Sequence, residues 1–173
     1  MKKYLKILLP LLFLGVLGYF GNQIVTKINH KKEIANNIKI MPSFTYQDVK
    51  GNTFTNKNLN PNMATVFFYY NSDCDFCNHE AQMVQKNMAK FKNYQLVFVS
   101  FEKPAKVKTF AQQYKLDICD NVTFAVDTQL TFASTFDVKS LPSIVIYDEN
   151  NALVKQLKGQ VKPEKIIELL TTN

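Results

Sequence analysis

A chain of 173 residues, 46% of them hydrophobic, can bury the core of one ordinary domain without cysteine staples, and five glycines and six prolines exclude a collagen-like or low-complexity protein. The formal charge of +7 lies mostly at the start, since residues 1–32 hold six lysines and no acid, whereas residues 33–173 hold fifteen lysines against fourteen acids. Because the body is nearly neutral and the chain contains no arginine, we expect no nucleic-acid partner.

The first residues combine a cationic start with an apolar run. Residues 7–26 carry no charge over twenty positions, which is just enough helix to span a bilayer core. A cleaved signal peptide is the alternative: no Ala-x-Ala site follows Phe20, although Gly18 and Gly21 leave cleavage open. We predict a signal anchor with a transmembrane helix over residues 1–28 and a polar linker over 29–40. The remainder is then expected on the periplasmic or extracytoplasmic side of the inner (cytoplasmic) membrane, on a single-pass protein.

The next elements are a hairpin, a buried strand and a helix. Two β-rich runs surround the turn signal DVKGN, where Gly51 suits a positive φ angle, so residues 43–56 predict a β-hairpin. The continuous apolar run MATVFFYY is typical of a strand buried on both faces. Apolar side chains then recur at helical spacing from Phe76 to Phe91, which predicts one helix. The aromatic residues of the run are assigned to the core, with Tyr70 also a candidate for lining a substrate groove.

Strands and helices continue to alternate to the end of the chain. The pattern predicts a strand at YQLVFVSF, a helix opened by Pro104, a strand near residues 122–127 and a helix near 130–136. The strands SIVIYDE and NALVKQL follow as an antiparallel hairpin, and Pro163 opens the last helix. This order predicts an α/β domain with a mixed central sheet flanked by helices.

Two cysteines, Cys74 and Cys77, lie where the buried strand passes into the helix. Backbone N–H groups and the helix dipole stabilise a Cys74 thiolate there, and the i, i+3 spacing places Cys77 on the same face, within reach to resolve a mixed disulfide. A permanent disulfide over so short a loop returns little entropy, and a zinc site lacks a second paired ligand motif, with only His79 and Cys119 of a suitable type. The spacing therefore favours a redox pair, with no metal and no cofactor.

Three segments, FTYQDVKGNTFTNKNL, ATVFFYYNSDCDFCNHE and DVKSLPSIVIYDENNALVKQLKG, resemble the membrane-anchored, thioredoxin-like thiol-disulfide oxidoreductases of bacteria, the TlpA and ResA group. The resemblance extends over nearly all of residues 40–171. It implies a thioredoxin fold over residues 41–173 with an N-terminal β-hairpin extension. It also implies an extracytoplasmic enzyme that exchanges disulfides with protein dithiol or disulfide substrates, in cytochrome c maturation or envelope redox homeostasis, with a membrane electron donor.

The resemblance also implies roles for five residues. Cys74 would attack as the exposed nucleophile, and Cys77 would resolve the mixed disulfide. Pro142 in SLPS matches the family's cis-proline, and Leu141 before it would offer backbone groups to an extended substrate peptide. Glu80 matches a glutamate near the pair and, as a half-buried carboxyl with a raised pKa, would hold or accept the thiol proton.

The sequence departs from the family pattern around the first cysteine. Asp73 and Phe76 stand where the family usually has Trp and Pro, and Phe68 stands where thioredoxins carry a buried Asp. Because Asp73 and Asp75 oppose a thiolate at Cys74, we predict a reducing or mildly poised exchanger rather than a strong oxidant.

Two further residues have open roles, and two other protein classes stay in view. His79 is expected on the helix surface, with tuning of the cysteine pair as the alternative, and Cys119 is expected at a strand entry, with a second resolving thiol as the alternative. A peroxiredoxin-type thiol peroxidase shares the fold but uses an arginine and a Pro-x-x-x-Thr-x-x-Cys segment, where this chain has YNSDC and no arginine. A copper or zinc carrier would use both cysteines of the pair and His79.

Overall fold

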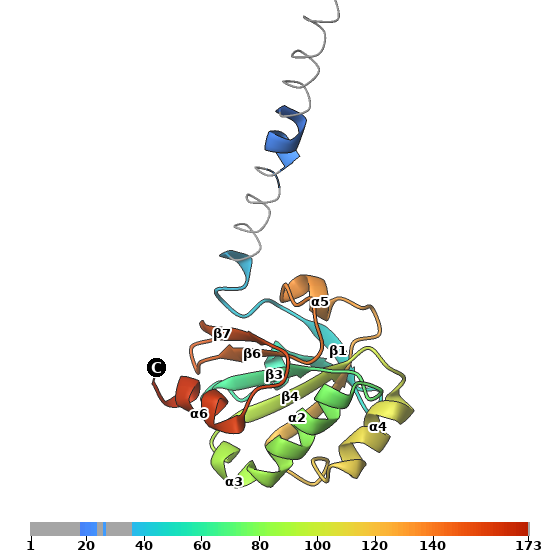
Figure 1. Cartoon of the computed structure of the whole chain (residues 1–173). Coiled ribbons are helices and arrows are strands. Elements are labelled where there is room, and N and C mark those ends of the chain that lie inside the picture. Colours follow the sequence, from blue (N-terminus) through green and yellow to red (C-terminus); the bar gives the residue numbers. More distant parts are fainter. Residues whose placement is uncertain (1–17, 24–25, 27–35, 173) are drawn as a thin grey trace, which may run out of the picture. The chain divides into compact units, whose positions relative to one another are not determined.

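The computed structural model describes residues 18–23, 26 and 36–172 (Figure 1). Residues 18–23 and Thr26 are helical. Within the described ranges, no helix has both the length and the apolar character needed to cross a membrane. Most of the predicted anchor, residues 1–28, lies outside the described residues. The same holds for residues 29–35 of the predicted linker. A compact unit begins at Ile38 and carries the sheet and the cysteine pair.

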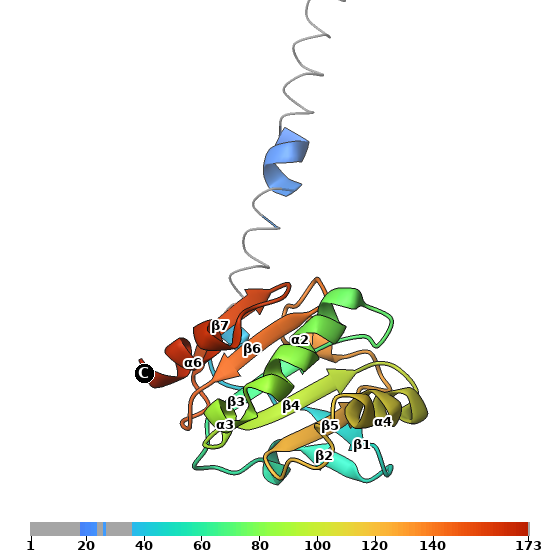
Figure 2. The same cartoon turned by 60° about the horizontal axis from the view of Figure 1, so that its bottom comes forward.

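The strands of this unit form one mixed sheet. In the described part of the chain it has seven strands in the order β2-β1-β5-β4-β3-β6-β7 (Figure 2). The elements are β1 Thr45–Asp48, β2 Thr53–Thr55, the 3-10 helix η1 Asn56–Asn58, β3 Thr65–Tyr69, α2 Asp75–Lys86, α3 Met88–Phe91, β4 Gln95–Ser100, α4 Pro104–Gln113, β5 Val122–Val126, α5 Phe132–Thr135, β6 Ser143–Tyr147, β7 Leu153–Lys158 and α6 Pro163–Thr171. β3, β4 and β5 run parallel, and the other pairs are antiparallel. The predicted thioredoxin-like α/β fold with a mixed sheet and an N-terminal hairpin is confirmed.

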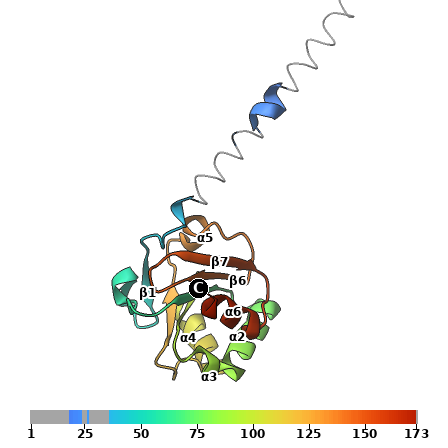
Figure 3. The ribbon, with the colours of Figure 1, turned by 90° about the vertical axis from the view of Figure 1, so that its left-hand side faces the viewer.

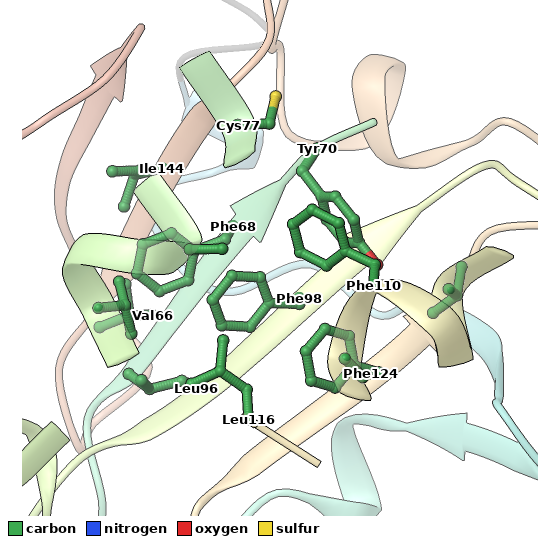
Figure 4. Close-up of a cluster of buried hydrophobic side chains, with 14 of the residues drawn as sticks. Val66, Phe68, Tyr70, Cys77, Leu96, Phe98, Phe110, Leu116, Phe124 and Ile144 are labelled. Atoms are coloured by element: carbon green, nitrogen blue, oxygen red, sulfur yellow. The ribbon is translucent and has the colours of Figure 1, made fainter. Parts of the chain in front are cut away.

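Helices cover both faces of the sheet, which explains the unbroken apolar run in β3. Val66, Phe68 and Tyr70 point to the face covered by α2, α3, α4 and α6 (Figure 4). Phe67 and Tyr69 point to the opposite face, where they pack with α5 and with the segment that precedes β1. Figure 3 shows α5 on one side of β6 and β7 and α6 on the other. Each residue of β3 is therefore buried whichever way its side chain points.

The predicted helix from Phe76 to Phe91 is wrong in one respect, because the chain breaks it at Asn87. Asn87 leaves the helical region at φ −116° and ψ 17°, which separates α2 from α3. Its side-chain amide donates to the carbonyl oxygen of Met83 at 2.9 Å, and its backbone N–H donates to that of Val84 at 3.0 Å. The short polar side chain thus supplies a local bond that ends the regular ladder.

Two other details also differ from the sequence prediction. The helix expected near residues 130–136 shortens to α5, because Leu130 adopts a positive φ of 57° just before it. Phe76, one of the apolar positions of the predicted helix, is 63% exposed. The inward stripe of α2 instead begins one residue later, at Cys77, and continues through Ala81 and Val84.

Candidate functional site

The cysteine pair lies at one edge of the sheet, where several chain ends meet. The carboxyl ends of β3, β4 and β5 share this edge because the three strands are parallel. The amino end of β6 joins them, since β6 is antiparallel to β3 and Ser143 faces Tyr69. The loop that carries Cys74 and the segment that precedes Ser143 therefore lie beside each other. Such strand ends are the usual place for functional sites in α/β sheets.

Cys74 occupies the N-cap position of α2 and is partly exposed. Its backbone carbonyl accepts the N–H of Asn78 at 3.0 Å, and its own N–H donates to the carbonyl of Asn71 at 3.2 Å. The side chain makes no capping hydrogen bond. Its sulfur is consequently placed at the positive end of a helix dipole and within reach of solvent.

Cys77 has the opposite surroundings, at 2% exposure in the apolar cluster under α2 (Figure 4). Burial raises the pKa of its thiol to about 12, and the hydrogen bond and charge of Cys74 and the charge of Glu80 add to this. Both cysteines are free thiols. The arrangement therefore brings together a reachable sulfur and a neighbouring sulfur that holds its proton tightly.

Glu80 lies one turn beyond Cys77 and is 2% exposed, so it is more deeply buried than predicted. One carboxyl oxygen, Oε2, accepts the backbone N–H of Val161 at 2.7 Å. The other, Oε1, is buried without a hydrogen-bond partner among the described residues. Burial raises the pKa of this carboxyl to about 7, although the Val161 hydrogen bond opposes the rise. Near neutral pH it can exist in either form, as a proton carrier must.

The segment before β6 contributes the predicted proline. The Leu141–Pro142 peptide bond is cis, which confirms the geometry implied by the resemblance. The carbonyl of Pro142 accepts the N–H of Gly159 at 2.8 Å, and Leu141 packs against both apolar clusters. No hydrogen bond from the described residues reaches the backbone of Leu141. Its peptide groups are thus free to pair with another chain.

Glu102, which follows β4 at the same edge, was not predicted as a site residue. Its carboxylate accepts the backbone N–H of Ser72 at 2.6 Å and the Ser72 hydroxyl at 2.7 Å. Lys106 contacts this carboxylate at 3.2 Å and that of Asp73 at 2.8 Å. An acid directly after a buried strand parallel to the cysteine strand was the signal available in the sequence.

Cys119 does not join the site. It precedes β5 and therefore lies at the amino edge of the parallel strands, whereas Cys74 follows β3 at the carboxyl edge. A five-residue strand spans about 15 Å, so Cys119 cannot serve as a second resolving thiol in this fold. Its Sγ instead faces the carbonyl of Lys115 at 3.7 Å.

Other candidates also lie apart from the chemistry. Tyr70 is 1% exposed and packs on Phe110 with ring centroids 4.2 Å apart, so it is a core residue and lines no groove. Phe68 stacks on Phe98 in the core, as predicted. His79 is exposed and borders a pocket of about 550 Å³ between α2 and α4 that contains neither cysteine of the pair. Over the described ranges, no three His, Cys, Asp or Glu side chains gather as a metal site would require.

Comparisons with known proteins agree with this picture. The sequence model of the AhpC/TSA family matches residues 39–156. The thiol-disulfide oxidoreductase ResA of Bacillus thuringiensis subsp. konkukian is 22% identical over 168 residues, which cover 95% of this chain and 92% of that protein. The match supports the resemblance to the TlpA and ResA group.

Two solved structures show the same fold. The putative thiol:disulfide interchange protein DsbE of Chlorobium tepidum has a TM-score of 0.65 at 19% identity and covers 78% of this chain and 94% of its own. The peroxidoxin BcpB of Mycobacterium tuberculosis has a TM-score of 0.66 at 18% identity and covers 77% of this chain and 94% of its own. At these identities the likeness concerns the fold alone, and the chemistry must be argued from the site.

Proposed function

The chain belongs to the AhpC/TSA family, and from this membership and the cysteine edge we propose that it is a thiol-disulfide oxidoreductase that acts on other proteins through Cys74 and Cys77. The observation that carries the proposal is the contrast between two adjacent thiols. Cys74 is partly exposed at a helix start, whereas Cys77 is buried with a pKa of about 12. One sulfur is reachable by a partner, and its neighbour is protected from it.

The first step is attack by the Cys74 thiolate on a substrate disulfide. A bond forms between Cys74 Sγ and one substrate sulfur, the substrate S–S bond breaks, and the second substrate sulfur leaves as a thiolate. The unpaired backbone N–H groups at the start of α2 and its dipole stabilise the attacking anion. The product is a mixed disulfide between the two proteins.

The second step needs a deprotonated Cys77. The ionised Glu80 carboxyl takes the Cys77 proton, and the new thiolate attacks Cys74 Sγ, which forms the Cys74–Cys77 disulfide and releases the reduced substrate. Substrate gains two electrons and the enzyme loses two. The unpartnered oxygen of Glu80 and its pKa of about 7 support this role.

The substrate binds as an extended peptide beside the cis-proline. The unpaired peptide groups of Leu141 pair with it in the manner of an added strand. Substrates are protein disulfides in this account, and a membrane protein returns electrons to the Cys74–Cys77 disulfide. The relatives named thiol-disulfide oxidoreductase ResA support the exchange cycle. Its place in cytochrome c maturation or envelope redox homeostasis is proposed from the resemblance to the TlpA and ResA group.

The apolar leader supports the proposed location. Residues 1–28 anchor the protein in the inner membrane as a single span, residues 29–40 form the linker, and residues 41–173 form the domain on the extracytoplasmic side. The uncharged stretch over residues 7–26 and the cationic start are the observations behind this proposal. The location is supported if an added protease digests the domain only after the outer layer of the cell envelope is permeabilised. Digestion of the domain from the cytoplasmic side would contradict the location.

A thiol peroxidase is the second candidate function, because the peroxidoxin BcpB shows that the same fold also occurs in a protein of that name. The chain lacks any arginine to polarise a peroxide, and YNSDC replaces the expected threonine segment. Stopped-flow measurement of hydrogen peroxide consumption by the reduced protein decides between the two. If the protein consumes hydrogen peroxide faster than it exchanges disulfides, it is a thiol peroxidase and the proposed exchange function is wrong.

A trapping experiment tests the exchange function directly. In a Cys77→Ser variant, Cys74 can attack but the mixed disulfide cannot be resolved, so covalent complexes with substrate proteins accumulate. A Cys74→Ser variant serves as the control and should capture none. Equal capture by the two variants, or none by either in oxidising cells, would contradict the proposal.

A further inference from the structure

The loop before Cys74 is held by a carboxylate from a neighbouring strand. Glu102 follows β4 and accepts two hydrogen bonds from Ser72 and one from the Ser100 hydroxyl, the last at 3.2 Å. Burial alone raises the pKa of Glu102, but the Ser72 hydrogen bonds and the Lys106 charge outweigh burial and leave the pKa below its ordinary value. Glu102 is therefore ionised at neutral pH and keeps a fixed negative charge at this position.

Lys106, in the first turn of α4, completes the arrangement. Its Nζ lies 2.8 Å from Asp73 Oδ2 and 3.2 Å from Glu102 Oε1. Glu102 is almost buried and is fixed by Ser72, so it holds the flexible lysine in one direction. The ammonium group is thus kept against Asp73, the residue that directly precedes Cys74.

We infer that Lys106 is a positioning residue for the exchange reaction, which offsets the charge of Asp73 and thereby increases the fraction of Cys74 present as thiolate. The sequence alone predicts that Asp73 and Asp75 oppose the thiolate. The ion pair offsets part of the contribution of Asp73, since Lys106 is shared with Glu102. This inference rests on the attacking role proposed for Cys74.

Other charged groups near Cys74 are few in the described chain. On its own loop and helix these are Asp73, Asp75, the exposed His79, and the buried Cys77 and Glu80. From the β4–α4 connection come Glu102 and Lys106. The cis-proline segment, which meets the pair from β6, presents Leu141 and Pro142, neither of which carries charge. Among the described residues, Lys106 is therefore the cation that ion pairs hold against Asp73, the residue before Cys74.

The test is the alkylation of Cys74 in the reduced full-length protein. The reagent is iodoacetamide, because a neutral reagent is not steered by surface charge, and the modified cysteine is identified by mass spectrometry. Rates are measured from pH 5 to pH 10 for wild type, Lys106→Gln, Lys106→Arg and Lys108→Gln. Lys108 lies two residues along the same helix and forms no ion pair among the described residues. Lys108→Gln therefore removes one positive charge from the same helix without breaking an ion pair, and serves as the matched control.

We expect Lys106→Gln to lower the rate at pH 7 about threefold, the size expected of one solvent-exposed charge, with the same rate as wild type at the alkaline plateau. Lys106→Arg and Lys108→Gln should react at about the wild-type rate. A Lys106→Gln profile equal to that of wild type, or an equal fall in Lys108→Gln, would overturn the inference.

Failure of this inference can be distinguished from failure of the proposed function, because the alkylation rate is measured on the Cys74 thiol itself without any substrate protein. If the Cys77→Ser variant captures no substrate in the trapping experiment, the exchange function fails. A lowered rate in Lys106→Gln would still establish the charge effect.

Discussion

Cys74 and Cys77 are three residues apart, yet they occupy two different regions of the molecule. Cys74 belongs to a polar rim, where Ser72, Glu102 and Lys106 link the loop to α4 through charged hydrogen bonds. Cys77 belongs to an apolar floor beneath α2, which holds Glu80 with one unpartnered oxygen. Burial in the floor disfavours the charged form of the Cys77 sulfur.

Two thiols one helical turn apart can therefore differ strongly in their exposure to solvent. Cys74, at the N-cap, is partly exposed at the margin of the apolar cluster, whereas Cys77, in the first turn of α2, is buried within it. The attacking role of Cys74 and the resolving role of Cys77 then follow from their different burial.

The largest effect is expected from removing the rim sulfur. Cys74→Ser should lower disulfide reduction at least about a thousandfold, because a hydroxyl is a far weaker nucleophile than a thiolate. Cys119→Ser, at the opposite edge of the sheet, should retain wild-type turnover. Reduction of insulin disulfides by each purified protein measures both, and a large loss in Cys119→Ser would contradict the placement of the site.

The burial of Glu80 in the floor should make the free energy of unfolding depend on pH. The pKa of Glu80 is raised from 4.5 to about 7 on folding, so the folded state holds this proton more tightly than the unfolded state. This contribution is fully present below pH 4.5 and is lost as the pH rises through 7, and its full size is about 3 kcal/mol.

Urea unfolding at several pH values measures this loss against a Glu80→Gln variant, which stays neutral throughout. Relative to the variant, wild type should lose about 2–3 kcal/mol between pH 4.5 and pH 7. A constant difference across that range would show that the carboxyl titrates normally.

The same carboxyl should affect catalysis. Glu80→Gln should slow resolution of the mixed disulfide about tenfold at pH 8, since Cys77 loses its proton acceptor. Wild type should accelerate as the pH passes 7, and the variant should lack this inflection. Rapid mixing with a fluorescent peptide disulfide gives the release rate, and an unchanged inflection in the variant would assign it to another group.

Smaller effects on stability are expected from removing one tyrosine hydroxyl group in each of the two regions. The Tyr70 hydroxyl is buried in the floor without a partner among the described residues, so Tyr70→Phe should stabilise the protein by about 1 kcal/mol. The Tyr114 hydroxyl donates to Asn78 Oδ1 at 2.9 Å beside the rim, so Tyr114→Phe should destabilise it by about 1 kcal/mol. Denaturant midpoints at pH 7 compare the two; changes of the same sign would contradict the contrast.

Much of this arrangement could be predicted from local sequence. The buried strand before Cys74, the cysteine spacing and the mixed sheet follow from short patterns with strong physical constraints. The cis peptide bond before Pro142 was expected only from the family resemblance. The break at Asn87 and the exposure of Phe76 were not predicted, because apolar spacing does not show where a side-chain amide replaces a helical bond or which neighbour turns inward. Glu102 and Lys106 were missed because their partners lie about 30 residues away in sequence, and only the pairing of β3 with β4 brings them together.

The most direct test of the central contrast is a comparison of the two thiols in one molecule. Reduced wild type is treated with iodoacetamide from pH 6 to pH 10, and the labelled cysteines are quantified by mass spectrometry. Cys74 should be labelled near neutral pH, while Cys77, whose pKa is about 12, should stay largely unmodified throughout. Labelling of Cys77 at the rate of Cys74 would contradict the account.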